Sequence, residues 1–179
     1  MKVEARSVDD LIAGSGARAE DMRRLDALIR ATAPELKRQL FAGPSITMIG
    51  YGELAWRNLS KSGVWPLLAL APQKHHMSLY VAAERGGLSL VQLEGDRLGR
   101  TSLGSYCIRF RCYLDLDEQA VASFIRAAIA AAADQKAIFG RDCARPVAAK
   151  ETASRPKQRS RGGKESPARA NSKKGRNRS

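Results

Sequence analysis

The chain has 179 residues, with 31 Lys and Arg against 18 Asp and Glu, which gives a formal net charge of +13. It contains no run of about 18 apolar residues, and its first residues lack the apolar stretch of a signal peptide. Its three cysteines show neither CxxC nor Cys/His finger spacing, which argues against a disulfide scaffold or a structural zinc site. We therefore expect a cytoplasmic protein without a membrane span.

The charge is concentrated at one end of the sequence. Residues 144–179 carry twelve basic and two acidic side chains and contain no Phe, Trp, Tyr, Leu, Ile or Met. Such a segment cannot bury enough apolar surface to offset its conformational entropy. Residues 1–143, by contrast, have the length of one domain with a hydrophobic core. We predict a folded domain over residues 1–143 and a disordered basic tail over residues 144–179.

Three helices are predicted in the first 45 residues. Ser7 is a possible N-cap for a short helix that ends at Gly14. A longer helix follows, because five residues share one face at helical spacing: Met22, Leu25, Leu28, Ile29 and Thr32. Pro34 can begin a third short helix, which would bury Leu36, Leu40 and Phe41 and end at Gly43–Pro44.

Strands are predicted between residues 45 and 111, where short apolar segments alternate with Gly, Pro and Asn. The expected strands are Ile46–Tyr51, Leu54–Asn58, Trp65–Ala71, His76–Ala83 and Tyr106–Arg111. The pattern of Leu88–Leu93 fits either a strand or a helical turn. We interpret the five strands as an antiparallel meander.

An amphipathic helix is predicted after the last strand. Asp115 and Glu118 have capping-box spacing, and Asp117 is an alternative cap. An apolar stripe follows, formed by Val121, Phe124, Ile125, Ala128, Ile129 and Ala132. Helices first, strands next and a helix last are typical of an α+β domain. We expect an antiparallel sheet of about five strands packed against the N-terminal helices and one C-terminal helix.

Several short motifs in residues 20–130 follow one another in the order seen in a known family. They are Leu25–Arg30 with Pro34–Glu35, Lys74–Tyr80, Leu98–Arg100 with Gly104, Tyr106–Arg111 and Leu114–Asp117. In this order they resemble the YdhG-like bacterial domain of unknown function. The resemblance implies a small α+β cytoplasmic domain without an established reaction. The sequence departs from the family at Gly43–Ser45, where many relatives carry a Trp-x-x-Pro segment, and in the basic tail.

One branch of this family is described as a frataxin-like intracellular iron chaperone, so the resemblance raises the question of iron. The acidic residues considered as ligands lie at predicted helix starts, where the helix dipole accounts for them; they are Asp9, Asp10, Glu20, Asp21, Asp115, Asp117 and Glu118. His75 and His76 are neighbours on a predicted strand and would face opposite sides. We therefore predict no metal site, no cofactor and no tightly held iron.

Candidate ligand-binding residues come from two predicted strands. Arg109 and Arg111 share one strand face, and His76 and Tyr80 lie on the polar face of another. If the strands are neighbours, these four side chains form a surface for a carboxylate or phosphate, which the planar guanidinium group suits. The alternative is an exposed sheet face with solvated arginines.

Catalytic motifs are missing from the sequence. The segment Gly95–Thr101 is one residue too short between its glycines for a phosphate-binding loop, and Arg100 stands where the lysine is required. Neither a Gly-x-Ser-x-Gly turn nor a His-Glu-x-x-His helix occurs. We expect a non-enzymatic binding or chaperone-like domain with a small ligand or a metal as its cargo.

The basic tail is a candidate nucleic-acid contact. Its cations can neutralise phosphates and release counterions, and without aromatic side chains it would do so regardless of base sequence. The candidate residues are Lys157, Arg159, Arg161, Lys164, Lys173, Lys174, Arg176 and Arg178. An accessory protein that binds DNA or RNA nonspecifically is thus the alternative function. A solubilising tail, or one that meets acidic proteins or membrane surfaces, would carry the same charge.

Overall fold

The computed structural model of the chain describes residues 3–42, 45–57, 62–133, 137–138 and 141–142. Its helices are α1 (Val8–Ala13), α2 (Ala19–Thr32), α3 (Leu90–Glu94) and α4 (Glu118–Ala133). Its strands are β1 (Arg38–Ala42), β2 (Thr47–Tyr51), β3 (Leu54–Arg57), β4 (Ser62–Trp65), β5 (Leu68–Pro72), β6 (Met77–Val81), β7 (Glu84–Arg85), β8 (Leu88–Ser89), β9 (Ser102–Leu103), β10 (Cys107–Phe110), β11 (Ala137–Ile138) and β12 (Arg141–Asp142).

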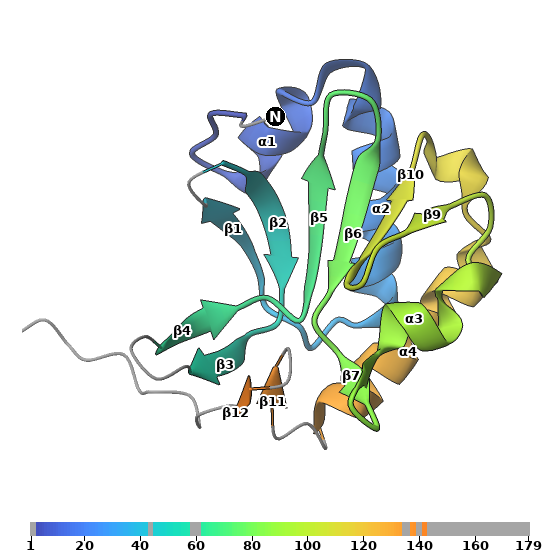
Figure 1. Cartoon of the computed structure of the whole chain (residues 1–179). Coiled ribbons are helices and arrows are strands. Elements are labelled where there is room, and N and C mark those ends of the chain that lie inside the picture. The colour runs from blue at the N-terminus through green and yellow to red at the C-terminus, as the bar shows by residue number, and fades with distance from the viewer. Residues whose placement is uncertain (1–2, 43–44, 58–61, 134–136, 139–140, 143–179) are drawn as a thin grey trace, which may run out of the picture. The chain divides into compact units, whose positions relative to one another are not determined.

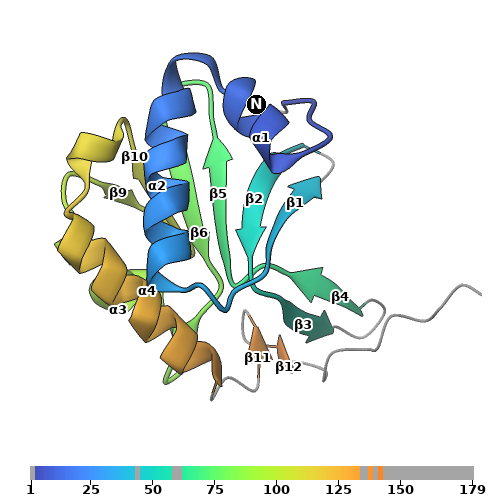
Figure 2. The same ribbon diagram turned by 180° about the vertical axis from the view of Figure 1, so that it is seen from behind.

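The main sheet has six strands in the order β1-β2-β5-β6-β10-β9, and every neighbouring pair is antiparallel (Figure 1). Helices α2 and α4 lie behind this sheet in Figure 1 and in front of it in the reverse view of Figure 2. The predicted α+β class, with helices packed on an antiparallel sheet, is therefore confirmed. Three further strand pairs, β3-β4, β7-β8 and β11-β12, lie outside the main sheet.

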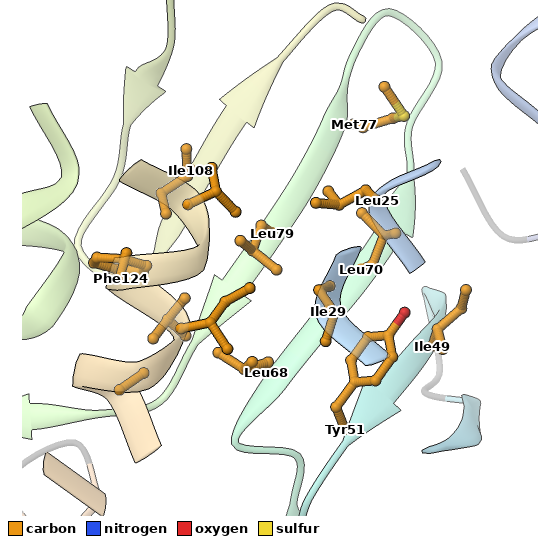
Figure 3. Packing of buried hydrophobic residues seen from close by; sticks show 14 of the residues in the cluster. Leu25, Ile29, Ile49, Tyr51, Leu68, Leu70, Met77, Leu79, Ile108 and Phe124 are labelled. Carbon is orange, nitrogen blue, oxygen red and sulfur yellow. The ribbon is translucent and has the colours of Figure 1, made fainter. Parts of the chain in front are cut away.

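The hydrophobic core fills the space between the sheet and the helices (Figure 3). Leu25 and Ile29 of α2 meet Leu70 of β5, and Phe124 of α4 lies toward Ile108 of β10. All five of these side chains are almost completely buried. Periodicity predicted this arrangement well, because α2 and α4 show a clear helical spacing of apolar residues.

The third predicted helix is wrong, because Arg38–Ala42 forms the edge strand β1 instead. Leu36, Leu40 and Phe41 fit helical spacing, but a strand places Leu40 and Phe41 on opposite faces. Leu40 packs against the main core, whereas Phe41 packs against a second apolar cluster on the other face of the sheet. Pairing with β2 therefore decides the conformation of this segment, and local spacing does not.

The meander is also corrected, since Trp65, which was expected to begin the strand that runs to Ala71, belongs to β4, and β5 begins at Leu68. The predicted strand Leu54–Asn58 corresponds to β3, which pairs with β4 in a separate hairpin and not with the main sheet, and Asn58 itself lies outside the described residues. The ambiguous segment Leu88–Leu93 divides into strand β8 and helix α3, whose N-cap Ser89 forms a capping box with Gln92. At α4 the cap is Asp117, whose carboxylate accepts a hydrogen bond from the Ala120 N–H.

A buried ionic group joins α2 to the edge of the sheet. The Asp26 carboxylate accepts hydrogen bonds from Arg38 Nε (2.8 Å) and Nη2 (2.9 Å) and from the Tyr51 hydroxyl (2.8 Å). The Asp26 side chain is only 6% exposed. Burial raises the pKa of Tyr51 well above its usual value, and the nearby Asp26 carboxylate raises it further. Tyr51 therefore remains a neutral hydrogen-bond donor to Asp26 in the folded protein.

The turn Leu98–Arg100 is held against the segment that precedes α4. The Arg100 N–H donates to the Asp115 carbonyl (2.7 Å), and the Asp117 N–H donates to the Leu98 carbonyl (3.0 Å). Between these bonds Gly99 has φ +112°, a conformation that other residues rarely adopt. A Cβ at Gly99 would also collide with the Asp115 carbonyl oxygen. Glycine is therefore required at this position on two independent grounds.

Replacing Gly99 by Ala is expected to lower the free energy of unfolding by about 3 kcal/mol, because backbone strain and a steric clash are combined. The control is Gly87→Ala, where φ is +80° but no atom lies within 4 Å of the added Cβ. This control should cost only the strain, about 1 to 2 kcal/mol. Urea denaturation measures both variants. Equal losses for the two would show that contact with Asp115 contributes nothing.

Candidate functional site

A cleft of about 500 Å³ lies at one end of strands β6, β9 and β10. Three segments contribute its polar side chains: the β5–β6 turn with His75–His76, the approach to β9 with Arg100–Ser102, and the end of β10 with Arg109 and Arg111. Asp115, from the short 3₁₀ helix before α4, completes the lining. The cleft is thus lined by three arginines, two histidines and one carboxylate, a set suited to an anionic ligand.

Asp115 organises the cleft and is fully occupied by partners. Its Oδ1 forms an ion pair with Arg100 Nη2 (2.8 Å), and its Oδ2 accepts the N–H groups of Arg111 (3.1 Å) and Cys112 (3.3 Å). Burial raises the pKa of Asp115, but these backbone donors and the Arg100 guanidinium outweigh it and lower the pKa below its usual value. Asp115 is therefore a carboxylate at neutral pH, and it fixes the end of β10 next to Arg100.

Arg109 and Arg111 supply uncompensated positive charge. Arg109 lies in register with Ser78 of β6 on one side and with Ser102 of β9 on the other. Its guanidinium passes close to Gly104, where a Cβ would be 3.1 Å from Nη2. Among the described residues, no ion pair joins Arg109 or Arg111 to a carboxylate. Both guanidinium groups are therefore available to a ligand.

His76 is a neutral side chain within this basic surrounding. Burial lowers the pKa of His76, and the positive charges of Arg109 and Arg18, with His75, lower it further. At neutral pH the imidazole therefore offers one donor and one acceptor. The turn that carries it is held by the Gln73 N–H, which donates to the His76 carbonyl (2.9 Å), and by Arg18 Nη2, which donates to the Lys74 carbonyl (3.0 Å).

The two histidines do not diverge as the sequence analysis expected. They precede β6, which begins at Met77, so strand alternation does not apply to them, and both line the cleft. Among the described residues, no group of three or more His, Cys, Asp or Glu is arranged to hold a metal ion.

The structure brings together three of the four candidate ligand-binding residues. His76, Arg109 and Arg111 line the cleft, whereas Tyr80 does not. Tyr80 lies opposite Cys107 on the same sheet face and packs against a small apolar cluster. The eight candidate nucleic-acid residues, Lys157 to Arg178, lie outside the described residues.

Sequence reasoning missed Arg100, Thr101, Ser102 and the organising role of Asp115. Leu98–Arg100 entered the sequence analysis as a motif of the resemblance and within the rejected phosphate-loop segment Gly95–Thr101, and Asp115 entered as a candidate helix cap. A usable signal was the glycine between Leu98 and Arg100, because a left-handed turn there can bring Arg100 back toward the next element.

The fold and the site define a small α+β domain with a basic cleft at one end of its sheet. No family model, curated protein or solved structure matches the chain. Within the described part of the chain, no helix is both long and apolar enough to cross a membrane.

Proposed function

We propose that the chain is a non-enzymatic, YdhG-like binding domain that holds a small anion in the cleft. The observation that carries this proposal is the convergence of Arg109 and Arg111, which have no described carboxylate partner, on a cleft of about 500 Å³. A volume of this size is typical of small-molecule sites. Two guanidinium groups can bind the oxygens of a carboxylate or phosphate in bidentate fashion.

The other lining residues support binding in preference to catalysis. The hydroxyl groups of Thr101 and Ser102 and the neutral imidazole of His76 can hydrogen-bond anion oxygens. Within the described residues, no hydrogen bond joins either hydroxyl to His75 or His76, so no activated nucleophile is assembled. The cleft therefore offers recognition groups and a fixed carboxylate, Asp115, that is already occupied.

Arg109→Gln and Arg111→Gln are each expected to weaken anion binding at least tenfold, because a charge-assisted hydrogen bond contributes about 1.5 to 3 kcal/mol. Isothermal titration calorimetry with inorganic phosphate and with acetate measures the loss. Arg126→Gln is the matched control, since Arg126 is an exposed arginine of α4 that does not line the cleft. Arg111→Lys tests whether the planar fork is needed in addition to the charge.

Two results would count against this site. If neither anion binds the unchanged protein, the cleft is not an anion site. If binding is the same in the Arg109, Arg111 and Arg126 variants, the anion is held elsewhere, and the arginines are solvated residues of a sheet face.

We also propose that residues 144–179 bind nucleic acid through charge alone. The observation that favours this second function is their charge of +10 within 36 residues, without an aromatic side chain. In this proposal the tail supplies affinity for phosphates, and the domain recognises a different ligand.

A further inference from the structure

The charged side chains that line the cleft carry an excess of positive charge. Three arginines, Arg100, Arg109 and Arg111, stand against a single carboxylate, that of Asp115. The excess is two charges, and a monoanion such as acetate leaves one of them unmatched. The Coulomb energy is proportional to the charge of the ligand, so a dianion gains about twice as much as a monoanion from the same groups. The cleft therefore favours an anion with two negative charges.

One acidic side chain holds two of the three arginines next to each other. Asp115 Oδ1 lies 2.8 Å from Arg100 Nη2, and Asp115 Oδ2 accepts the Arg111 N–H (3.1 Å). Arg109 precedes Arg111 by two residues and lines the same cleft. The Arg100 side chain is 81% exposed, so its other N–H groups are accessible to a ligand. Such a set suits a phosphoryl group, whose three terminal oxygens are strong hydrogen-bond acceptors.

The size and the lining of the cleft indicate what is attached to the phosphoryl group. A volume of about 500 Å³ is in the range that holds small organic molecules, and a phosphoryl group alone would leave most of it to water. Among the described residues that line the cleft, Phe110 is the only one with an apolar side chain, and it is 3% exposed. The hydroxyl groups of Thr101 and Ser102 and the imidazole of His76 can instead pair with hydroxyl groups of a ligand. The remainder of the ligand is therefore polar.

We propose that the ligand of the cleft is the phosphate monoester of a small hydroxylated molecule, with its phosphoryl group at Arg100, Arg109 and Arg111. This inference rests on the function proposed above and extends it to the class of ligand. A phosphate monoester carries about 1.5 to 2 negative charges at pH 7, because its second pKa is about 6. A phosphodiester or a monocarboxylate carries only one. The monoester therefore gains more than either of them from the excess charge of the cleft.

A fall in pH acts on the ligand and on His76 in opposite directions. Acid protonates the phosphate monoester and removes its second charge, which weakens binding. Burial lowers the pKa of His76, and the positive charges of Arg109 and Arg18, with His75, lower it further. Protonation of His76 in acid adds a positive charge to the cleft and strengthens the binding of every anion. The remaining charged side chains of the lining are Arg100, Arg111 and Asp115, whose lowered pKa keeps it ionised.

Isothermal titration calorimetry on the full chain tests the class of ligand. At pH 8, glycerol 3-phosphate, a dianion, is expected to bind at least about tenfold more tightly than the monoanions dimethyl phosphate and acetate. It should also bind more tightly than sulfate, a dianion without a polar body. Between pH 8 and pH 5 the affinity ratio of glycerol 3-phosphate to sulfate should fall about fivefold, because only about a tenth of the ester remains a dianion. Sulfate keeps its charge over this range, so the ratio cancels the contribution of His76.

Arg100→Gln tests selection by charge. The substitution lowers the excess charge of the cleft, and because the Coulomb energy scales with the charge of the ligand, the fold loss for a dianion should be the square of that for a monoanion. We expect about tenfold weaker binding of glycerol 3-phosphate and about threefold weaker binding of acetate. Arg100→Lys keeps the charge and should preserve the preference for the dianion. Arg126→Gln is again the control. The basic residues 144–179 are the same in every variant, so anion binding by them does not enter the comparison.

The contrary results can be told apart. If dimethyl phosphate or acetate binds as tightly as glycerol 3-phosphate and still depends on Arg109 and Arg111, the anion site stands and this inference is wrong. Tighter binding of succinate would replace the phosphate monoester by a dicarboxylate. Equal binding of sulfate would show that the polar body contributes nothing, which also overturns the inference. If no anion binds, the inference fails together with the proposed function. Urea denaturation verifies that each variant is folded.

Discussion

Asp26→Ala is expected to lower the free energy of unfolding by about 3 to 5 kcal/mol, the usual cost of removing one partner from a buried ion pair. The substitution leaves the Arg38 guanidinium and the Tyr51 hydroxyl without their shared acceptor. Tyr51 is 1% exposed and has little access to water as a replacement. Urea denaturation followed by circular dichroism measures the loss. A change below about 1 kcal/mol would show that the group contributes little to stability.

Two further variants show why Asp26 matters. The Asp9 carboxylate lies 3.5 Å from Arg38, and the Asp9 side chain is 88% exposed. Asp9→Asn should therefore lower the free energy of unfolding by less than about 1 kcal/mol. The triple variant Asp26→Leu, Arg38→Met, Tyr51→Phe replaces the whole group by apolar side chains. It should recover most of the stability lost in Asp26→Ala, because no polar atom of the group remains unpaired. Recovery would show that Asp26→Ala loses stability because it leaves buried polar groups without hydrogen-bond partners, and not because it removes the electrostatic attraction between Asp26 and Arg38.

The two long helices, α2 and α4, and the central strands could be predicted from the sequence because each has one dominant local pattern. The apolar stripe from Val121 to Ala128 fixes α4, and alternation fixes β10. The segment around Leu40 has no single dominant pattern, because the spacing of its apolar residues fits a helix as well as a strand. Its pairing with Ile49 of β2 settles the matter, and that pairing is not a local property.

The same distinction applies to the candidate site. Alternation along β10 was sufficient to place Arg109 on the sheet face opposite Ile108 and Phe110, whereas His76 reaches the cleft from the turn before β6, where alternation does not apply. Strand alternation could not place Arg100, because its position depends on the turn at Gly99 and on two backbone hydrogen bonds to the segment before α4. Tyr80 was grouped with the cleft because it shares the face, but it lies four residues along the strand from His76, about 13 Å away.

The buried ionic group illustrates a third limit. Asp26 lies between Leu25 and Leu28 in a helix whose other acidic residues, Glu20 and Asp21, are in its first turn. Helical spacing places Asp26 on the same face as Met22 and Ile29, which predicts burial. Its partners come from β1 and β2, and β1 was expected to be a helix. The error in one element therefore concealed the partner of a buried charge.

Deleting residues 144–179 is expected to remove most of the affinity of the chain for duplex DNA and most of its salt dependence. If about six of the twelve basic side chains contact phosphates at once, log K should fall against log salt with a slope of about −5. Between 50 and 200 mM salt the full chain would then lose roughly a thousandfold in affinity. Fluorescence anisotropy with a labelled duplex, measured over this range for both proteins, gives the two slopes.

The tail should contribute through charge and not through base sequence. Replacing Lys173, Lys174, Arg176 and Arg178 by Gln should reduce the magnitude of the slope by no more than about four units, one for each phosphate no longer neutralised. Duplexes of different sequence should bind alike, because the tail contains no aromatic side chain for stacking. Arg126→Gln, an exposed arginine of α4 outside the cleft, is the control and should leave the slope unchanged. If the truncated domain binds DNA as tightly as the full chain, the contact instead belongs to the folded domain, where the cleft arginines Arg109 and Arg111 become the first residues to test.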